Sequence, residues 1–556
     1  MAAITALFLL YFLRLADDNR LTRWAWVFEG NAATRIYFPA LGGAALAYLL
    51  SCTRFIEDRP AAWLFVISFA TSAFFWKEPE LIVDASRYFT QAKHLELYGA
   101  GYFIREWGRA VPAWTDMPLV PFLYGLLFKF FGEARIFVQV LTTTLFSLTV
   151  VLTYRTATEL WDNREAGLYA GLFLLGVPYV YTQVPLMLAD IPSTFFFTLS
   201  VYTFVVAIKR GGIRIPLAAL ALFAAFLSKY SIWLMLTTPG VVLAVYLFSP
   251  ETGATRIQSN GRKYRMQCLL RAGSIMLLSA SLAGAVFLYM GDVLTEQMRF
   301  LIDFQSPGLK RWGESLVSTF LFQIHPFFTG AAVLSLFVAI RRRDARVLIT
   351  LWPIMLLLAL QVKRIRYTLP ALPLLAVAAS YGLFALRDRE TRRFVALCAA
   401  SCSIMLALFA YAPLMQRMNC VNLKQAGDFL NSIPQKDVEV YIAPYAAPVL
   451  NPAVDVPILD LFTRKNILYN YEPEQQPSSE EVAVSPLRFT WEYKNPVYYR
   501  YNPAQLSGSA VVVIAGEAGK SLPDKLQQRT KHFHFSKEFT VSDDMFMHQT
   551  LVTVYY

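Results

Sequence analysis

The chain has 556 residues, of which 56% are hydrophobic and 15% are aromatic. A water-soluble protein of this length fills its core with a smaller apolar fraction, so the composition excludes an ordinary soluble enzyme and indicates a polytopic membrane protein. The formal net charge of +12 does not indicate nucleic-acid binding. The Lys and Arg residues cluster in short loops between apolar segments, which is typical of cytoplasmic loops.

Apolar segments of membrane-spanning length follow one another along the chain, and they predict an all-α membrane domain of about 11–13 transmembrane helices. The clear segments are 60–77, 134–155, 165–183, 191–208, 214–229, 231–248, 266–290, 316–340, 345–361, 366–386 and 393–413. Two further candidates lie upstream, at 35–53 and 2–14. The segment 2–14 is short for a span and is also suited to the membrane interface. It lacks the basic region and cleavage pattern of a signal peptide, so no cleaved signal is expected.

The charged loops predict how the chain is oriented in the membrane. If 60–77 runs outward, the basic loops near 54–59, 155–164, 209–214, 256–265, 341–346 and 387–393 all lie on the inner side, in agreement with the positive-inside rule. The exception is "QVKRIRY", residues 361–367, which falls on the outer side. Segments 78–133, 184–190 and 291–315 are then external, as is everything after about residue 414. The misplaced basic cluster invites a functional interpretation.

The pattern changes after residue 414 and predicts a small soluble α/β domain. "LKQAGDFLNSIP" and "SLPDKLQQR" predict helices, whereas "DVEVYIA", "SAVVVIAG" and "QTLVTVYY" predict strands. Residues 464–508, rich in Tyr, Pro and Asn, are expected to be irregular. We therefore expect two domains: a transmembrane domain at 1–413, whose external loop 78–133 carries functional residues, and an extracytoplasmic α/β domain at 414–556.

Three carboxylates lie on the expected outer side, each where the chain leaves or enters the membrane. Asp84 opens the first long external loop, Asp116 precedes a semi-apolar segment, and Asp190 lies in a short turn between two spans. A carboxylate at this depth is costly unless it is paired, so the three predict a polar site. For Asp190 alone, which precedes Ile-Pro, a helix N-cap is an equally good interpretation.

Basic residues are expected on the same side as these carboxylates. They are Arg87, Lys229, Lys363, Arg364 and Arg366. Arginine suits bidentate recognition of phosphate and lysine supplies a point charge, although Lys363 and Arg364 are also placed to extend toward lipid headgroups. Carboxylates and cations on one outer face suit a lipid-linked phosphate ester as substrate.

Five stretches, in this order, carry a family resemblance. They are "VDASRYFTQAKHLELYG", "MPLVPFLYGLLFKFFGEARIFVQVL", "LMLADIPSTFFFTLSVYTF", "LAALALFAAFLSKYSIWL" and "KRIRYTLPALPLLAV". Over roughly residues 60–386 the chain resembles the GT-C membrane glycosyltransferases, in the branch of the lipid A aminoarabinose transferases and the protein O-mannosyltransferases. The C-terminal α/β domain is more similar to the aminoarabinose-transferase type. The resemblance implies a polyprenyl-phosphate-sugar donor, a lipid, glycan or protein acceptor, and a bacterial inner membrane with the C-terminal domain in the periplasm.

The resemblance also implies roles for single residues. Asp84 corresponds to a general base or an acceptor-positioning group, and Asp190 and Asp116 complete the catalytic candidates. For donor phosphate binding the resemblance implies Arg366, Lys229, Arg87, Tyr367 and Tyr88, and the charge and position of Lys363 and Arg364 make them further candidates. Relatives often carry Asp-Glu where this chain has Asp84-Ala85, and Lys-Pro-Pro or His-Pro-Pro where it has Asp116-Met117-Pro118. These departures leave the acceptor and any metal open; a divalent cation, if one takes part, is expected at Asp84 and Asp190.

The expected mechanism is transfer with inversion. Arg366, with Lys229 or the Lys363–Arg364 pair, stabilises the departing phosphate, and Asp84 takes the proton of the acceptor. His94 is an alternative base, although a histidine on a loop helix more often packs. A transporter or flippase of lipid-linked sugars is the rival interpretation, but transporters place such groups near the bilayer midplane and in repeated halves. A third interpretation is a glycan-binding or assembly protein.

Overall fold

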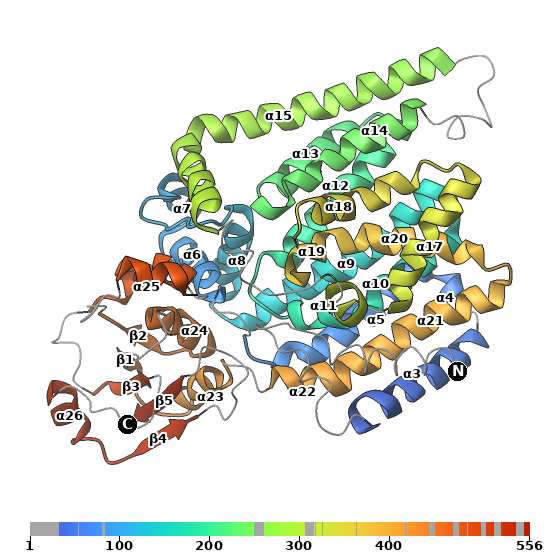
Figure 1. Ribbon diagram of the computed structural model, residues 1–556. Coiled ribbons are helices and arrows are strands. Elements are labelled where there is room, and N and C mark those ends of the chain that lie inside the picture. The colour runs from blue at the N-terminus through green and yellow to red at the C-terminus, as the bar shows by residue number, and fades with distance from the viewer. Residues whose placement is uncertain are drawn as a thin grey trace.

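The computed structural model describes residues 33–53, 55–80, 84–248, 261–305, 316, 318–324, 326–362, 364–416, 420–443, 451–470, 478–485, 488–501, 508–515, 524–540 and 550–556. A helical part is followed by a small C-terminal sheet domain (Figure 1). This confirms the predicted fold class. The predicted segment 2–14 lies outside the described residues.

The helical part runs from α3 to α22. Its helices are α3 Phe38–Ser51, α4 Phe55–Asp58, α5 Pro60–Ala73, α6 Ala85–Tyr98, α7 Ala100–Glu106, α8 Leu119–Phe131, α9 Arg135–Trp161, α10 Arg164–Leu175, α11 Pro178–Gln183, α12 Asp190–Arg210, α13 Arg214–Phe226, α14 Thr238–Phe248, α15 Gly261–Phe300, α17 Pro326–Arg342, α18 Val347–Ala359, α19 Ile365–Thr368, α20 Leu372–Gly382, α21 Arg389–Leu406 and α22 Ala412–Met415.

Six of the described helices are long and apolar enough to cross a membrane. They are Arg135–Trp161, Asp190–Arg210, Tyr230–Phe248, Arg262–Asp303, Ile365–Ala385 and Arg389–Tyr411. Four shorter apolar helices accompany them: Phe38–Ser51, Leu119–Phe131, Arg214–Phe226 and Val347–Ala359. The number of predicted spans is larger because some of them form helices shorter than a span, such as α13 and α18, or are divided. The predicted span 165–183, for example, becomes α10 and α11, since Val177 before Pro178 is extended and interrupts the helix.

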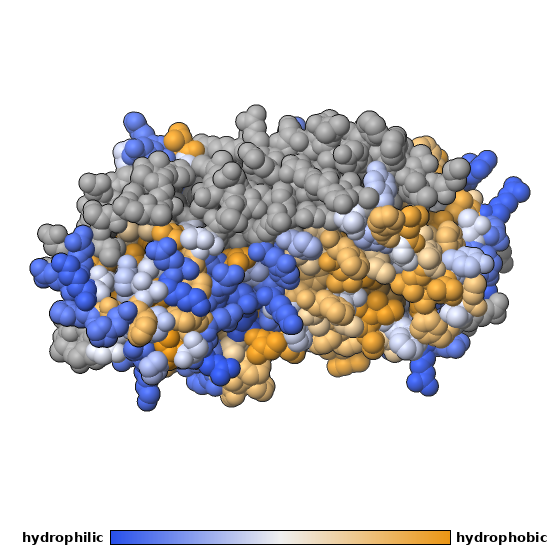
Figure 2. Space-filling model, turned by 90° about the horizontal axis from the view of Figure 1, so that it is seen from below, coloured by the Kyte–Doolittle hydropathy of each residue, from blue (hydrophilic) through white to orange (hydrophobic). Residues whose placement is uncertain are grey.

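The surface of the helical part carries the hydrophobic belt expected of a membrane protein. Figure 2 shows a hydrophobic zone over the helices, with hydrophilic side chains gathered over the C-terminal domain and at the opposite end. Exposed Phe38, Leu41 and Leu49 of α3 are among the apolar side chains that face outward. Apolar side chains in such numbers on an outer surface are stable against lipid and not against water.

The interior of the helical part is formed by the helices that carry the predicted site. The stretch Ile365–Ala385, which contains α19 and α20, is the most buried of the six long segments, and Asp190–Arg210 follows it. Small residues let these helices approach closely. A Cβ on Gly382 of α20 would lie 1.9 Å from the carbonyl oxygen of Ala331 in α17, so only glycine fits at this crossing.

The C-terminal domain is built on a five-stranded mixed sheet of order β2-β1-β3-β5-β4. Its strands are β1 Asp437–Ile442, β2 Asn466–Leu468, β3 Ala510–Ala515, β4 Ser536–Phe539 and β5 Leu551–Tyr555, and its helices are α23 Val421–Leu430, α24 Asp455–Phe462, α25 Ser479–Val484 and α26 Asp524–Thr530. β2, β1 and β3 are parallel, with Val438 opposite Ala510, and β5 runs antiparallel to both β3 and β4.

All five elements predicted for this domain are present. The sequence did not predict α24, α25, β2 or β4, and both β2 and α25 lie inside the stretch 464–508 that was expected to be irregular. In Figure 1 the domain lies beside α6 and α8 at one end of the helical part, and α24 packs directly against α6. The predicted boundary at residues 413 and 414 stays a prediction.

Candidate functional site

Asp84 stands at the N-terminus of α6 and binds two arginines. Its side chain makes no capping hydrogen bond to the helix. Instead its Oδ2 accepts a hydrogen bond from Nη1 of Arg366 at 2.5 Å, and its Oδ1 lies 3.8 Å from Nη2 of Arg87. Asp84 and Arg366 are 282 residues apart in the chain, so the fold has brought together two predicted members of the site.

Asp190, the first residue of α12, lies deeper and binds two cations. Ala189 occupies the N-cap position of this helix. The Asp190 carboxylate accepts hydrogen bonds from Nζ of Lys229 at 2.7 Å and from Nε of Arg366 at 2.9 Å. The interpretation of Asp190 as a simple N-cap is therefore wrong, because both carboxylate oxygens are taken by side chains from other segments.

Asp116, in the loop between α7 and α8, extends the site in the other direction. One oxygen lies 3.5 Å from Nη2 of Arg87, and the other accepts a hydrogen bond from Nε2 of Gln91 at 3.3 Å. The hydroxyl of Tyr88 also donates to this carboxylate. The three contacts come from one face of α6, because residues three and four apart on a helix point the same way.

Six predicted residues thus form one network of alternating charge, which we call the charge network: Lys229, Asp190, Arg366, Asp84, Arg87 and Asp116. Its carboxylates are buried to different degrees. The Asp190 side chain is 1% exposed and the Asp84 side chain 13%. Buried charges are tolerated when each has an opposite partner, which this alternation provides. Arg366, from the cluster "QVKRIRY" that departs from the predicted positive-inside pattern, is a member of this network.

The environment moves the pKa values of Asp84 and Asp116 in opposite directions. Burial raises the pKa of Asp84, but Arg366 and Arg87 outweigh it and hold that pKa well below its ordinary range. Burial also raises the pKa of Asp116, and there Arg87 does not outweigh it. Asp84 is therefore the carboxylate that stays ionised, and Asp116 is the one that retains a proton more readily.

The pKa of Asp116 leads to a test by pH. Because its pKa is raised in the folded protein, ionising it costs stability as the pH rises from the ordinary Asp value through the raised one. An Asp116→Asn variant has no such charge. We expect its unfolding temperature, relative to that of the unmodified protein, to increase as the pH is raised through this window. Thermal unfolding in detergent at a series of pH values measures it, and a pH-independent difference would contradict the raised pKa.

Two tyrosines and two further basic residues were predicted beside this network. Tyr367 lies with its ring centroid 5.6 Å from Nζ of Lys229 and 5.9 Å from Cζ of Arg364, so it packs between two cations. Arg364 is close enough to Asp84 to lower the pKa of that carboxyl. Tyr88 is buried against Asp116. Lys363 lies outside the described residues.

The structure adds residues that the sequence did not single out. Gln297, near the end of α15, donates hydrogen bonds to the carbonyls of Ala113 and Asp116 and accepts one from the hydroxyl of Tyr230 at 2.5 Å. It thereby fixes the Asp116 loop. Gln91 had a detectable signal, since it lies seven residues after Asp84 on the same helical face. Gln297 had none, because α15 reaches the site only through its tertiary packing beyond a kink at Met290.

A second buried ion pair supports the turn before Asp190. Arg135 binds Glu80 at 2.8 Å and also donates to the carbonyl of Pro185. Glu80 in turn accepts from the backbone N–H of Met187. Nearby, the hydroxyl of Tyr124 donates to the carbonyl of Leu188 at 2.6 Å. The chain from 185 to 188 is thus held on both sides, which fixes where α12 and its Asp190 begin.

The network does not fit a resident metal ion. Among the residues that the structure describes, no group of three or more His, Cys, Asp or Glu side chains is placed to hold one. Asp84 and Asp190, the predicted positions for a divalent cation, are bridged by the guanidinium of Arg366. Hard divalent cations require several oxygen ligands, and here a positive group already lies between the oxygens. We derive no step through a metal.

His94, the alternative base, lies beyond Gln91 on α6 and contacts the C-terminal domain. Its Nδ1 lies 2.8 Å from the carbonyl of Thr90, and its ring packs edge-on against Tyr498 of the C-terminal domain at 5.1 Å. Burial lowers its pKa. His94 therefore packs between domains, as the alternative interpretation of a loop-helix histidine expected.

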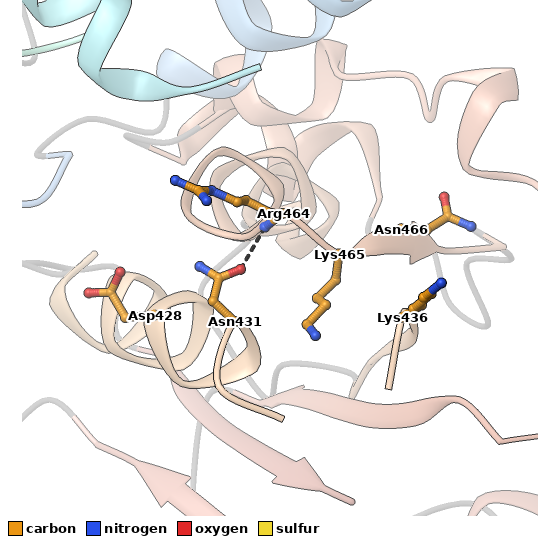
Figure 3. Close-up of a pocket in the computed structure, with 6 residues that line it drawn as sticks. All are labelled: Asp428, Asn431, Lys436, Arg464, Lys465 and Asn466. Atoms are coloured by element: carbon orange, nitrogen blue, oxygen red, sulfur yellow. Dashed lines mark hydrogen bonds between the residues drawn. The ribbon is translucent and has the colours of Figure 1, made fainter. Parts of the chain in front are cut away.

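A polar hollow of about 680 Å³ lies on the C-terminal domain. It is lined by Asp428, Asn431, Lys436, Arg464, Lys465 and Asn466. Figure 3 shows that the side chains of Arg464, Lys465 and Lys436 extend in different directions. Lys465 donates to the carbonyl of Ile433, and the Asn431 amide oxygen accepts from the backbone N–H of Arg464. These cations do not converge on one point, in contrast to Arg366 and Lys229, so the charge network is the better candidate site.

Comparisons with known proteins agree with this architecture. Residues 112–277, which include Asp116, Asp190 and Lys229, match the family model described as dolichyl-phosphate-mannose-protein mannosyltransferase. Among curated proteins no sequence matches the chain. Two crystal structures of ArnT from Cupriavidus metallidurans, one bound to undecaprenyl phosphate and one in the apo state, are similar to it with a TM-score of 0.53 each. Sequence identity is 13% and 12%, and each comparison covers 89% of this chain and 98% of the other. At the level of the fold, the expected resemblance to the GT-C membrane glycosyltransferases is confirmed.

Proposed function

We propose that this protein is an integral membrane glycosyltransferase that moves a sugar from a polyprenyl-phosphate donor to an acceptor. The observation that carries the proposal is the pairing of Arg366 and Lys229 at the charge network. Two cations held by one buried carboxylate are fixed in place to receive a phosphate. The matching family model and the fold shared with a protein that binds undecaprenyl phosphate support this class of donor. We place the reaction on the periplasmic face of a bacterial inner membrane.

The donor phosphate competes with Asp84 for Arg366. Asp190 is the deeper partner and keeps Arg366 and Lys229 in place, whereas Asp84 is more exposed and holds only the outer Nη1. An oxygen of the donor phosphate takes the place of the Asp84 oxygen at Nη1 of Arg366, so this nitrogen still binds an anion. Arg366 and Lys229 then stabilise the charge that develops on the phosphate as the bond to the sugar breaks.

The same exchange prepares Asp84 to accept a proton. Arg366 is the foremost of the cations that hold its pKa low, so losing that contact raises the pKa and makes Asp84 a stronger base. The hydroxyl or amine of the acceptor bonds to the anomeric carbon from the opposite face, and its proton passes to Asp84. The bond from that carbon to the phosphate oxygen breaks, polyprenyl phosphate leaves, and the configuration inverts. Asp116 and Arg87 are placed to orient the acceptor.

Mass spectrometry of lipid-linked sugars and envelope glycans tests this function. Three strains are compared: one with the active protein, one without it, and one with Asp84→Asn. We expect one lipid-phosphate sugar to accumulate and one acceptor to lose a single sugar in both defective strains. If the lipid-linked sugars and every glycan are the same in all three strains, the proposal is wrong and transport is the next activity to test.

Lys229 gives a test of donor binding that does not depend on the acceptor. In Lys229→Met one charge-assisted hydrogen bond partner of the phosphate is lost, which costs about 1.5–3 kcal/mol, or about ten- to a hundredfold in affinity. We expect the dissociation constant for undecaprenyl phosphate to increase by this factor. Lys424→Met, in an exposed ion pair with Asp428 on the C-terminal domain, is the control and should bind normally. Unchanged binding in Lys229→Met would remove Lys229 from the phosphate site.

A further inference from the structure

The helix that supplies Asp84 and Arg87 to the charge network has a second functional face. Asp84, Arg87 and Gln91 lie on the side of α6 that faces the network. Lys93 follows Asp84 by nine positions, which at about 3.6 residues per turn is two and a half turns, so it points to the opposite side. On that side α6 packs against α24 of the C-terminal domain.

Lys93 is a buried ion at this domain contact. Its Nζ lies 2.5 Å from Oδ2 of Asp460 in α24 and 3.2 Å from the carboxylate of Glu133, in the link between α8 and α9. The Lys93 side chain is 14% exposed and that of Asp460 is 1% exposed. The hydroxyl of Tyr499 donates to the same Asp460 oxygen at 2.7 Å. One ammonium thus joins three segments that are far apart in the sequence.

Aromatic rings complete the enclosure of this ammonium. Its Nζ lies 5.4 Å from the ring centroid of Phe89 and 5.6 Å from those of Tyr498 and Tyr499. Burial lowers the pKa of Lys93, but Asp460 and Glu133 outweigh it and raise the pKa above its ordinary value. The lysine is therefore charged, and its contacts are directional. A buried pair of this kind disfavours other arrangements of the two domains, because they would leave a charge unpaired.

We propose that Lys93 is a positioning residue through which the C-terminal domain holds α6, and with it Asp84 and Arg87, in the geometry of the charge network. The effect on turnover depends on the proposed glycosyltransferase function, whereas the effect on α6 does not. Arg366 and Lys229 come from other segments, α19 and the chain after α13. Loss of Lys93 therefore displaces the proton acceptor and leaves the phosphate cations in place.

The experiment compares Lys93→Met, Lys93→Arg and the control Lys424→Met in the full chain in detergent. Transfer kinetics and amide hydrogen exchange are measured for each. For Lys93→Met we expect kcat to fall about a hundredfold, which is the loss caused when a reacting group is displaced by about 1 Å. KM for the donor should change by less than about twofold, because Arg366 and Lys229 do not move. Exchange should increase about tenfold or more at residues 85–91 and stay unchanged in β1, β3 and α12.

The two other variants separate positioning from folding. Lys93→Arg keeps the charge and should retain more turnover than Lys93→Met, and Lys424→Met should match the unmodified protein. Unchanged exchange at 85–91 in Lys93→Met overturns the proposal, and so does an increase that includes β1 and β3, since Lys93 would then only stabilise the domain. If the unmodified protein transfers no sugar, the proposed function fails, and the exchange at 85–91 alone decides whether Lys93 holds α6.

Discussion

Replacing Arg366 by lysine is expected to reduce sugar transfer about a hundred- to a thousandfold, the cost of losing a donor that stabilises charge in a transition state. Lysine keeps the positive charge but not the geometry. The Arg366 guanidinium binds Asp190 through Nε and Asp84 through Nη1, and a single ammonium on a flexible stem cannot reproduce both contacts. The measurement is single-turnover transfer from a polyprenyl-phosphate sugar with enzyme in excess.

Two comparisons make the Arg366 result specific. Arg341→Lys changes an exposed arginine at the end of α17 and should leave transfer unchanged. Arg366→Met, which also removes the charge, should lose at least as much transfer as Arg366→Lys, and its unfolding temperature should fall because Asp190 keeps only Lys229 as its partner. If Arg366→Lys transfers sugar at the normal rate, bidentate binding by Arg366 has no part in the reaction.

Asp84→Asn is expected to separate transfer from donor binding. Asparagine has nearly the shape of aspartate but cannot accept the proton of the acceptor, so transfer should fall about a hundred- to ten-thousandfold. Binding of undecaprenyl phosphate should be retained or become tighter, because a neutral side chain competes less with phosphate for Arg366. Equilibrium binding and single-turnover transfer, measured on the same preparation, check both expectations.

The control for Asp84→Asn is Asp58→Asn, which changes an exposed carboxylate at the end of α4 and should leave both measurements unchanged. A loss of donor binding in Asp84→Asn equal to the loss of transfer would assign Asp84 to the structure of the phosphate site and leave the base to be found elsewhere. Asp116→Asn is then the next variant to test, since Asp116 is the other carboxylate that contacts Arg87.

Much of the site could be predicted from the sequence, because placing its charged side chains at a membrane boundary is energetically unfavourable unless they are paired. Asp84, Asp116 and Asp190 are carboxylates at a predicted membrane boundary, and Arg366 lies in the one basic cluster that contradicts the orientation predicted from the other loops. Unpaired charges in such places are strongly unfavourable. Their presence therefore indicates partners, even though the sequence does not say which carboxylate binds which cation.

Other parts of the site carry no such signal. Gln297 is a buried polar residue in a long apolar helix, and its contact with the Asp116 loop depends on the kink of α15 at Met290. The local sequence around Asp190 is compatible with both a helix cap and a member of the charge network. Only the positions of Lys229 and Arg366 in the folded structure decide between the two roles. Lys93 is one of several charges on an amphipathic helix, and its burial depends on α24, which the sequence did not predict.

The sequence by itself determined the membrane character of this protein, most of its apolar segments and three strands of its C-terminal sheet, β1, β3 and β5. These follow from composition and from periodicities of two and 3.6 residues, which are local properties of the chain. The tertiary structure alone decided that Asp84 meets Arg366 across 282 residues, and that Lys93 meets Asp460 across 367. Such pairings depend on the packing of whole helices against one another, and no short stretch of sequence contains that information.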